Sequence, residues 1–166
     1  EDILNQCVMR ACNPNSVEHW EWDRNIGVAC ALYRGFYSRH PDNNKRRNYT
    51  MGLDINNASR DYLYGRLLAV AERLEEVALR IGGEKRRTTA ERYMQQFAEK
   101  PFNTWRNIEL ALDSTKARLR ASRVGFLNNR EKEITEITNM FQGDDYCNPS
   151  KLTGEFLLGY HCQKMT

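Results

Sequence analysis

The clearest candidates for a functional site in this sequence are basic residues at helical spacing, which could bind a negatively charged partner. Lys116, Arg120 and Arg123 follow one another at intervals of four and three residues, and Arg118 flanks them. The spacing predicts that the three share one face of a long helix. Such a row of cations is suited to phosphate groups, because every phosphate of a nucleic acid carries a negative charge.

Further basic residues lie elsewhere in the chain. The segments GEKRRTT (83–89) and NKRRN (44–48) each hold three basic residues in succession, and Arg66, Arg73 and Arg80 recur once per heptad. Pairing within the helix, for example with Glu76, is the alternative use for the heptad arginines. The candidate nucleic-acid-binding residues are Arg66, Arg73, Lys85, Arg86, Arg87, Arg106, Lys116, Arg118, Arg120 and Arg123.

The net charge of +3 is unevenly distributed along the chain. The stretch from Arg60 to Lys132 holds 16 Lys and Arg against 10 Asp and Glu, a net charge of +6, whereas the rest holds 9 against 12, a net charge of −3. A basic central segment is typical of a chain that meets phosphates. An ordinary solvated surface is the alternative interpretation, and charge alone leaves it open.

Patterns of catalytic residues are weak. The sequence has no P-loop, no dinucleotide fingerprint and no nucleophile elbow, and its three histidines are isolated from one another. The acidic pairs Glu75–Glu76 and Asp144–Asp145 and the glutamates between 131 and 136 are expected to be solvated surface charges. We therefore expect a protein that is not an enzyme and that carries no cofactor.

The five cysteines include no Cys-x-x-Cys pair, which indicates reduced thiols in a cytosolic protein rather than a disulfide framework. Cys147, His161 and Cys162 could meet near a zinc ion, but adjacent residues of a helix point in different directions and a fourth ligand is not evident. We therefore expect no metal.

No apolar run approaches the roughly 20 residues that span a bilayer, so we expect no membrane segment. The first residue is a glutamate rather than an initiator methionine, as expected of a fragment or a processed product.

Helices must position the candidate residues, because the apolar residues recur at helical spacing and no convincing strand pattern is present. The predicted helices cover about 3–11, 17–40, 59–82, 88–100, 103–123, 129–141 and 153–164. The sequence therefore predicts an all-α bundle of about six to seven helices with mostly short connections.

Capping residues support several of these boundaries. Ser16 and Ser59 are placed to cap the second and third helices, Thr88 and Glu91 form a capping box, and Gly82-Gly83 ends the third helix. The irregular segment 40–59 predicts a division into N-terminal helices with a linker (1–50) and a helical bundle (51–166).

Two glycines interrupt predicted helices. Gly65 lies within the first turns of the third helix and Gly159 within the last helix. A glycine inside a helix costs about 1 kcal/mol relative to alanine. Because it has no side chain, another backbone can approach closely there, so we expect both to be packing points, either between helices or between this bundle and a neighbouring subunit.

Three segments taken together resemble a known family. They are MGLDINNASRDYLYGRLLAVAERLEEVAL (51–79), TTAERYMQQFAEKPFNTW (88–105) and LTGEFLLGYHCQK (152–164). In this order they are similar to the C-terminal part of the large subunit of the type I-C CRISPR interference complex, Cascade. The resemblance covers about 51–164 and, more loosely, the helix at 17–40.

The resemblance implies a function. In that family the C-terminal helical region is also made separately, by internal translation, as a small subunit. Its copies lie beside the backbone subunits that hold the CRISPR RNA and near the large subunit, and they help to hold the target DNA and the displaced strand. A recruited helicase–nuclease performs cleavage, so the implied role is non-catalytic and cytoplasmic.

Two other classes stay open from the residues. A stand-alone helical DNA- or RNA-binding regulatory protein would need a tight turn between two short helices, with base-reading side chains at the start of one of them. No such pair is clear in the sequence. An enzyme that uses a buried carboxylate or cysteine is the other class, and nuclease activity or bound metal in the purified chain would reveal it.

Overall fold

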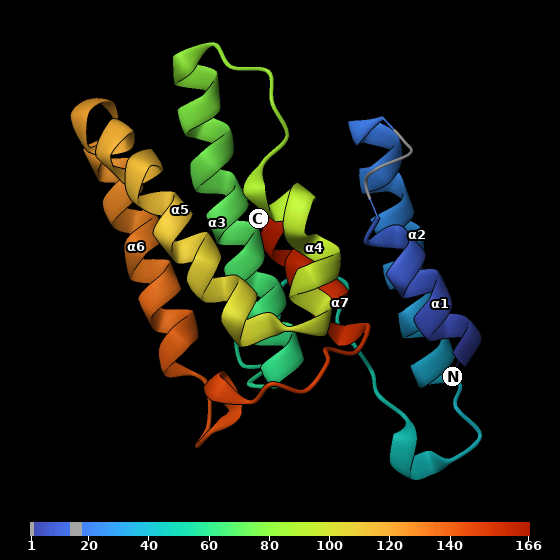
Figure 1. Ribbon diagram of the computed structural model, residues 1–166. Helices are drawn as coiled ribbons and strands as arrows, with labels where there is room; N and C mark the ends of the chain where they lie inside the picture. The colour runs from blue at the N-terminus through green and yellow to red at the C-terminus, as the bar shows by residue number, and fades with distance from the viewer. Residues whose placement is uncertain (1, 14–17) are drawn as a thin grey trace.

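The computed structural model describes residues 2–13 and 18–166, and over these residues it consists of α-helices and two short 3₁₀ helices without any strand (Figure 1). The elements are α1 (Asp2–Ala11), α2 (His19–Ser38), η1 (Asn43–Lys45), α3 (Arg60–Gly82), α4 (Thr89–Glu99), α5 (Pro101–Ser122), α6 (Val124–Asn139), η2 (Asp145–Cys147) and α7 (Glu155–Lys164). The predicted all-α bundle of six to seven helices is confirmed.

Helix α3 is the central element, and α4, α5, α6 and α7 all pack against it (Figure 1). Every residue from 62 to 72 is buried, which is the pattern of a helix covered on all sides. In α5, five residues at helical spacing predict a single inward-facing stripe, and all five are buried. These are Trp105, Ile108, Leu112, Thr115 and Leu119.

Gly65 and Gly159 lie at the crossing of α3 and α7, where the two backbones touch. A methyl group on Gly65 would overlap the Phe156 carbonyl oxygen and lie 2.6 Å from the Tyr160 nitrogen. A methyl group on Gly159 would overlap the Tyr62 carbonyl oxygen. The prediction that both glycines are packing points between helices is confirmed.

The helix ends agree in part with the predicted caps. Thr88 and Glu91 form the predicted capping box, and Gly83 ends α3 with a φ of 65°, in the left-handed region that favours glycine. Ser59 occupies the N-cap position of α3, but its hydroxyl donates to Glu155 (3.0 Å) rather than capping the helix. The predicted cap Ser16 lies outside the described residues.

Helix α6 begins at Val124 rather than near Asn129, so the predicted start is wrong by about one turn. The stretch GFLNN has little intrinsic tendency to form a helix. Leu127 is nevertheless fully buried and Phe126 packs against the core, so tertiary packing extends the helix.

Helices α1 and α2 form a hairpin that packs against α7 (Figure 1). The Trp22 and Tyr160 ring centroids lie 6.3 Å apart, and the Cys30 thiol donates to the Leu157 carbonyl (3.3 Å). The division at residue 51 stays a prediction, although the buried side chains of the hairpin and of the bundle form a single apolar cluster.

Candidate nucleic-acid interface

Seven basic residues gather at one end of the bundle, where α3 and α5 finish and α6 begins; this is the upper end in Figure 1. We call this surface the basic end. It consists of Arg80, Lys85, Arg86, Arg87, Arg118, Arg120 and Arg123. Cations are favoured at the C-terminal ends of helices because the unpaired carbonyl groups carry partial negative charge.

The loop between α3 and α4 (83–88), which carries three of these residues, is anchored by a buried carboxylate. Glu75, which is 3% exposed, accepts from the Thr89 backbone N–H (2.5 Å) and the Thr89 hydroxyl (3.1 Å). Arg86 Nη1 lies 3.0 Å from the same carboxylate. The prediction that Glu75 is a solvated charge is wrong, because the loop folds back over α3 and the N-terminus of α4 attracts the negative charge.

Arg118 ties α5 to this loop. Its Nη1 lies 2.6 Å from Glu84 Oε1 and donates to the Ala78 carbonyl oxygen (3.2 Å). Glu84 Oε2 lies 3.1 Å from Arg86 Nε. Two predicted site residues from separate parts of the chain, Arg86 and Arg118, therefore share one carboxylate.

A hollow of about 490 Å³ opens between the end of α3 and this loop. Leu79 and Arg80 line one side, residues 84–88 line the other, and Glu76 and Glu91 complete the wall. The lining combines an apolar surface with four cations and three carboxylates, and this small excess of positive charge favours a negatively charged ligand that also presents apolar area.

The predicted shared face of Lys116, Arg120 and Arg123 is only partly correct. Helix α5 ends at Ser122, and Arg123 has a non-helical backbone (φ −143°, ψ 47°) where the chain turns into α6. Lys116 is half-buried and lies 3.6 Å from Glu131 of α6. Arg120 and Arg123 are exposed and, within the part of the chain that the structure describes, form no ion pair.

Arg66 does not belong to the interface, and its prediction is wrong. It is 6% exposed, and its guanidinium donates to Gln163 Oε1 (2.9 Å) and Met140 Sδ (3.6 Å). Burial lowers its pKa. The reason is that Arg66 lies in the buried half of α3. It is the only charged residue between 62 and 71, and this lack of other charges was the sequence pattern that indicated burial.

Arg73 and Arg106 are exposed but lie away from the basic end. Arg73, in the middle of α3, pairs with Glu76 at 3.9 Å, and Arg106, near the start of α5, lies over the Phe102 ring at 5.9 Å. The structure therefore does not bring these two residues together with the other predicted site residues.

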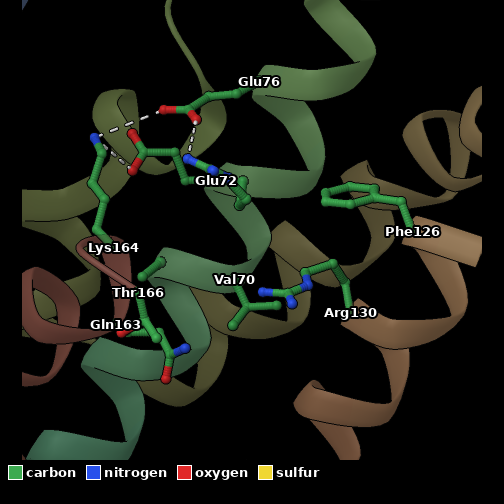
Figure 2. A pocket seen from close by; sticks show the side chains of 10 residues that line it. Val70, Glu72, Glu76, Phe126, Arg130, Gln163, Lys164 and Thr166 are labelled. Carbon is green, nitrogen blue, oxygen red and sulfur yellow. Dashed lines mark ion pairs between the residues drawn. The ribbon is translucent and has the colours of Figure 1, made fainter. Parts of the chain in front are cut away.

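A second cavity, of about 130 Å³, lies between α3, α6 and α7 (Figure 2). Lys164 Nζ lies 3.1 Å from Glu72 and 3.8 Å from Glu76, and the Tyr160 hydroxyl also donates to Glu72. Burial raises the pKa of Glu72, and Lys164 opposes that rise. Because Lys164 is already paired with these carboxylates, the cluster joins α3 to α7 and is poorly suited to phosphate.

The described residues contain no group of three or more His, Cys, Asp or Glu that could hold a metal ion. Cys147 is exposed on η2 whereas Cys162 is buried in α7, which disfavours the zinc alternative. All five cysteines are free thiols, as expected. Among the helices of the described ranges, none is both long enough and apolar enough to cross a bilayer.

Sequence reasoning missed the acidic residues that organise the basic end. Glu84 lies inside a basic run, and Glu75 belongs to an acidic pair on a helix, so both patterns resemble ordinary surface sequence. Their partners lie on other elements, and no local spacing predicts such contacts. Only the two glycines before Glu84 gave a local signal, since they predicted a tight helix end.

The comparisons with known proteins give one family. A family model described as CRISPR-associated protein (Cas_Csd1) matches residues 1–166. The comparison with curated proteins finds no match. The family match includes the α1–α2 hairpin as well as the bundle.

Proposed function

Since this chain belongs to the Cas_Csd1 family of CRISPR-associated proteins, we propose that it is a non-catalytic, small-subunit-like component of a type I-C RNA-guided interference complex. In this role it lines the complex and stabilises the target DNA and the displaced strand. Its partners are the backbone subunits that hold the CRISPR RNA, the large subunit and the DNA itself, in the cytoplasm.

The observation that carries the proposal is the basic end. Seven basic side chains lie on one end of a helical bundle. They come from three segments: the end of α3, the loop 83–88 and the turn from α5 to α6. In RNA-guided complexes base pairing reads the sequence, and protein subunits supply electrostatic contacts to the backbone. A rigid helical scaffold with exposed arginines is suited to that task.

We expect reversal of three unpaired cations of the basic end to weaken DNA binding. In the variant Lys85→Glu, Arg120→Glu and Arg123→Glu, each change removes a side chain that forms no ion pair within the described residues. The affinity for DNA should fall by about 100-fold at low salt, and the slope of log K against log salt should flatten by about two. Fluorescence anisotropy at several salt concentrations measures both quantities.

The matched control reverses Arg39, Lys100 and Lys151. These side chains are exposed. Arg39 follows α2, Lys100 precedes α5 and Lys151 precedes α7, so none of them belongs to the segments that form the basic end. The control makes the same change in net charge and should alter the affinity much less. Equal losses in the two variants would show that net charge alone drives binding and would contradict the proposed interface.

Copurification tests the assembly itself. The parent chain should elute with the CRISPR RNA and the backbone subunits when the components are produced together. Elution as a free protein under those conditions would contradict membership of the complex.

A further inference from the structure

Glu84 lies between two arginines, one on its own loop and one on α5. Its Oε1 is 2.6 Å from Arg118 Nη1, and its Oε2 is 3.1 Å from Arg86 Nε. One carboxylate therefore bridges two guanidinium groups, with one oxygen on each. Two oxygens of a phosphate group bridge arginines in the same manner, and guanidinium geometry favours such contacts.

Each arginine is also held by the protein without Glu84. Arg118 Nη1 donates to the Ala78 carbonyl oxygen (3.2 Å), and Arg86 Nη1 lies 3.0 Å from the buried carboxylate of Glu75. Both guanidinium groups are thus attached to the bundle at a second point. The site would keep its two donors in place if the Glu84 side chain moved away.

The backbone below this pair is adapted to it. A methyl group on Gly82 would lie 2.6 Å from Arg118 Nη1 and 2.9 Å from Glu84 Oε1. Glycine therefore leaves room for the ion pair directly above the last turn of α3, whereas a larger residue would require the ends of these two flexible side chains to shift. This requirement is separate from that of Gly83, which supplies the left-handed end of the helix.

Glu84 itself is held weakly. Its side chain is 35% exposed and extends from a loop, and ion pairs at such positions contribute little to stability. Hydrogen bonds from Arg118 and Arg86 lower its pKa, so the carboxylate is charged at neutral pH. It therefore competes with any incoming anion for the same two donors.

We propose that Arg86 and Arg118 form a phosphate-binding site, that the Glu84 carboxylate occupies it in the free protein, and that a backbone phosphate of a nucleic acid displaces this carboxylate. The use of the site by nucleic acid rests on the function proposed above. The existence of the anion site does not, because any phosphate should bind there.

The first experiment uses inorganic phosphate as the probe. Phosphate is titrated into the parent, Glu84→Gln and the double variant E84Q/R86Q, while NMR follows the side-chain N–H groups of Arg86 and Arg118. We expect E84Q to bind phosphate about fivefold more tightly than the parent, and E84Q/R86Q to lose the response at Arg118. Thermal unfolding of each variant checks that the fold is retained.

The second experiment measures DNA binding of E84Q against salt, with Glu136→Gln as the matched control. Glu136 is an exposed glutamate of α6 that also pairs with a cation, Lys132 at 3.7 Å, so the change in net charge is the same. We expect E84Q to bind DNA about fivefold more tightly than E136Q, with a salt slope steeper by about one.

The outcomes separate the two proposals. If phosphate binds E84Q at Arg86 and Arg118 but no variant binds DNA, the anion site stands and the proposed function fails. If DNA binds and E84Q behaves like E136Q, the proposed function stands and the displacement of Glu84 is overturned. Phosphate responses that are equal in E84Q and E84Q/R86Q would overturn the site itself.

Discussion

Gly65→Ala is expected to destabilise the protein strongly, because the added methyl group has no space between the backbones of α3 and α7. It would overlap the Phe156 carbonyl oxygen of α7, and backbone atoms cannot move aside as a flexible side chain can. Overpacking of a core usually costs 1–3 kcal/mol, and overlap with a backbone at a helix crossing should cost about 4 kcal/mol or more. Circular dichroism during urea or thermal unfolding measures the loss.

The matched control is Gly125→Ala in α6. A methyl group there meets nothing within 4 Å, so only helix propensity changes, and alanine should stabilise the protein by up to about 1 kcal/mol. The two substitutions are chemically identical, yet they should change the free energy of unfolding in opposite directions. Similar unfolding midpoints for G65A and the parent would mean that the two helices separate at little cost, against the packing described above.

Residues 51–166 expressed alone are expected to aggregate or to lose cooperative unfolding. Removal of α1 and α2 would expose the face of α7 that they cover, including Leu157 and Tyr160, each 1% exposed in the full chain. It would also leave Lys164 without its contact to Asp23 (3.3 Å). A contiguous apolar face of this kind is a liability in a free protein.

Calorimetry and size-exclusion chromatography of 51–166 test this expectation, and addition of residues 1–50 as a separate peptide is the control. If the peptide restores cooperative unfolding, the two leading helices belong to the same folding unit as the bundle. A monomeric fragment that unfolds cooperatively on its own would instead support the division at residue 51, and with it a shorter small subunit.

The fold was predictable where one helix face decides burial. The stripe from Trp105 to Leu119 has a strict helical period, and each member is buried as predicted. The capping box of Thr88 and Glu91 was equally predictable, because it is a contact between residues close together in the sequence. Interactions of this local kind depend on spacing alone.

The candidate site was less predictable because its organisation depends on which sides of each helix are covered. Arg66 and Arg73 have the same heptad position, yet one is buried against α7 and the other is exposed. A heptad repeat also drifts by about 20° per seven residues on a straight helix. Glu84 and Arg118 meet only because the ends of α3 and α5 lie together.

The contact between α3 and α7 also sets the order in which the chain can fold during synthesis. About 70 residues separate the end of α3 from the start of α7, and a ribosome adds about 5–20 residues per second. The apolar surface of α3 around Gly65 is therefore synthesised several seconds before α7, the helix that covers it. Throughout that time the nascent chain exposes apolar residues of its central helix, so its yield in the cell should depend on chaperones that bind such segments.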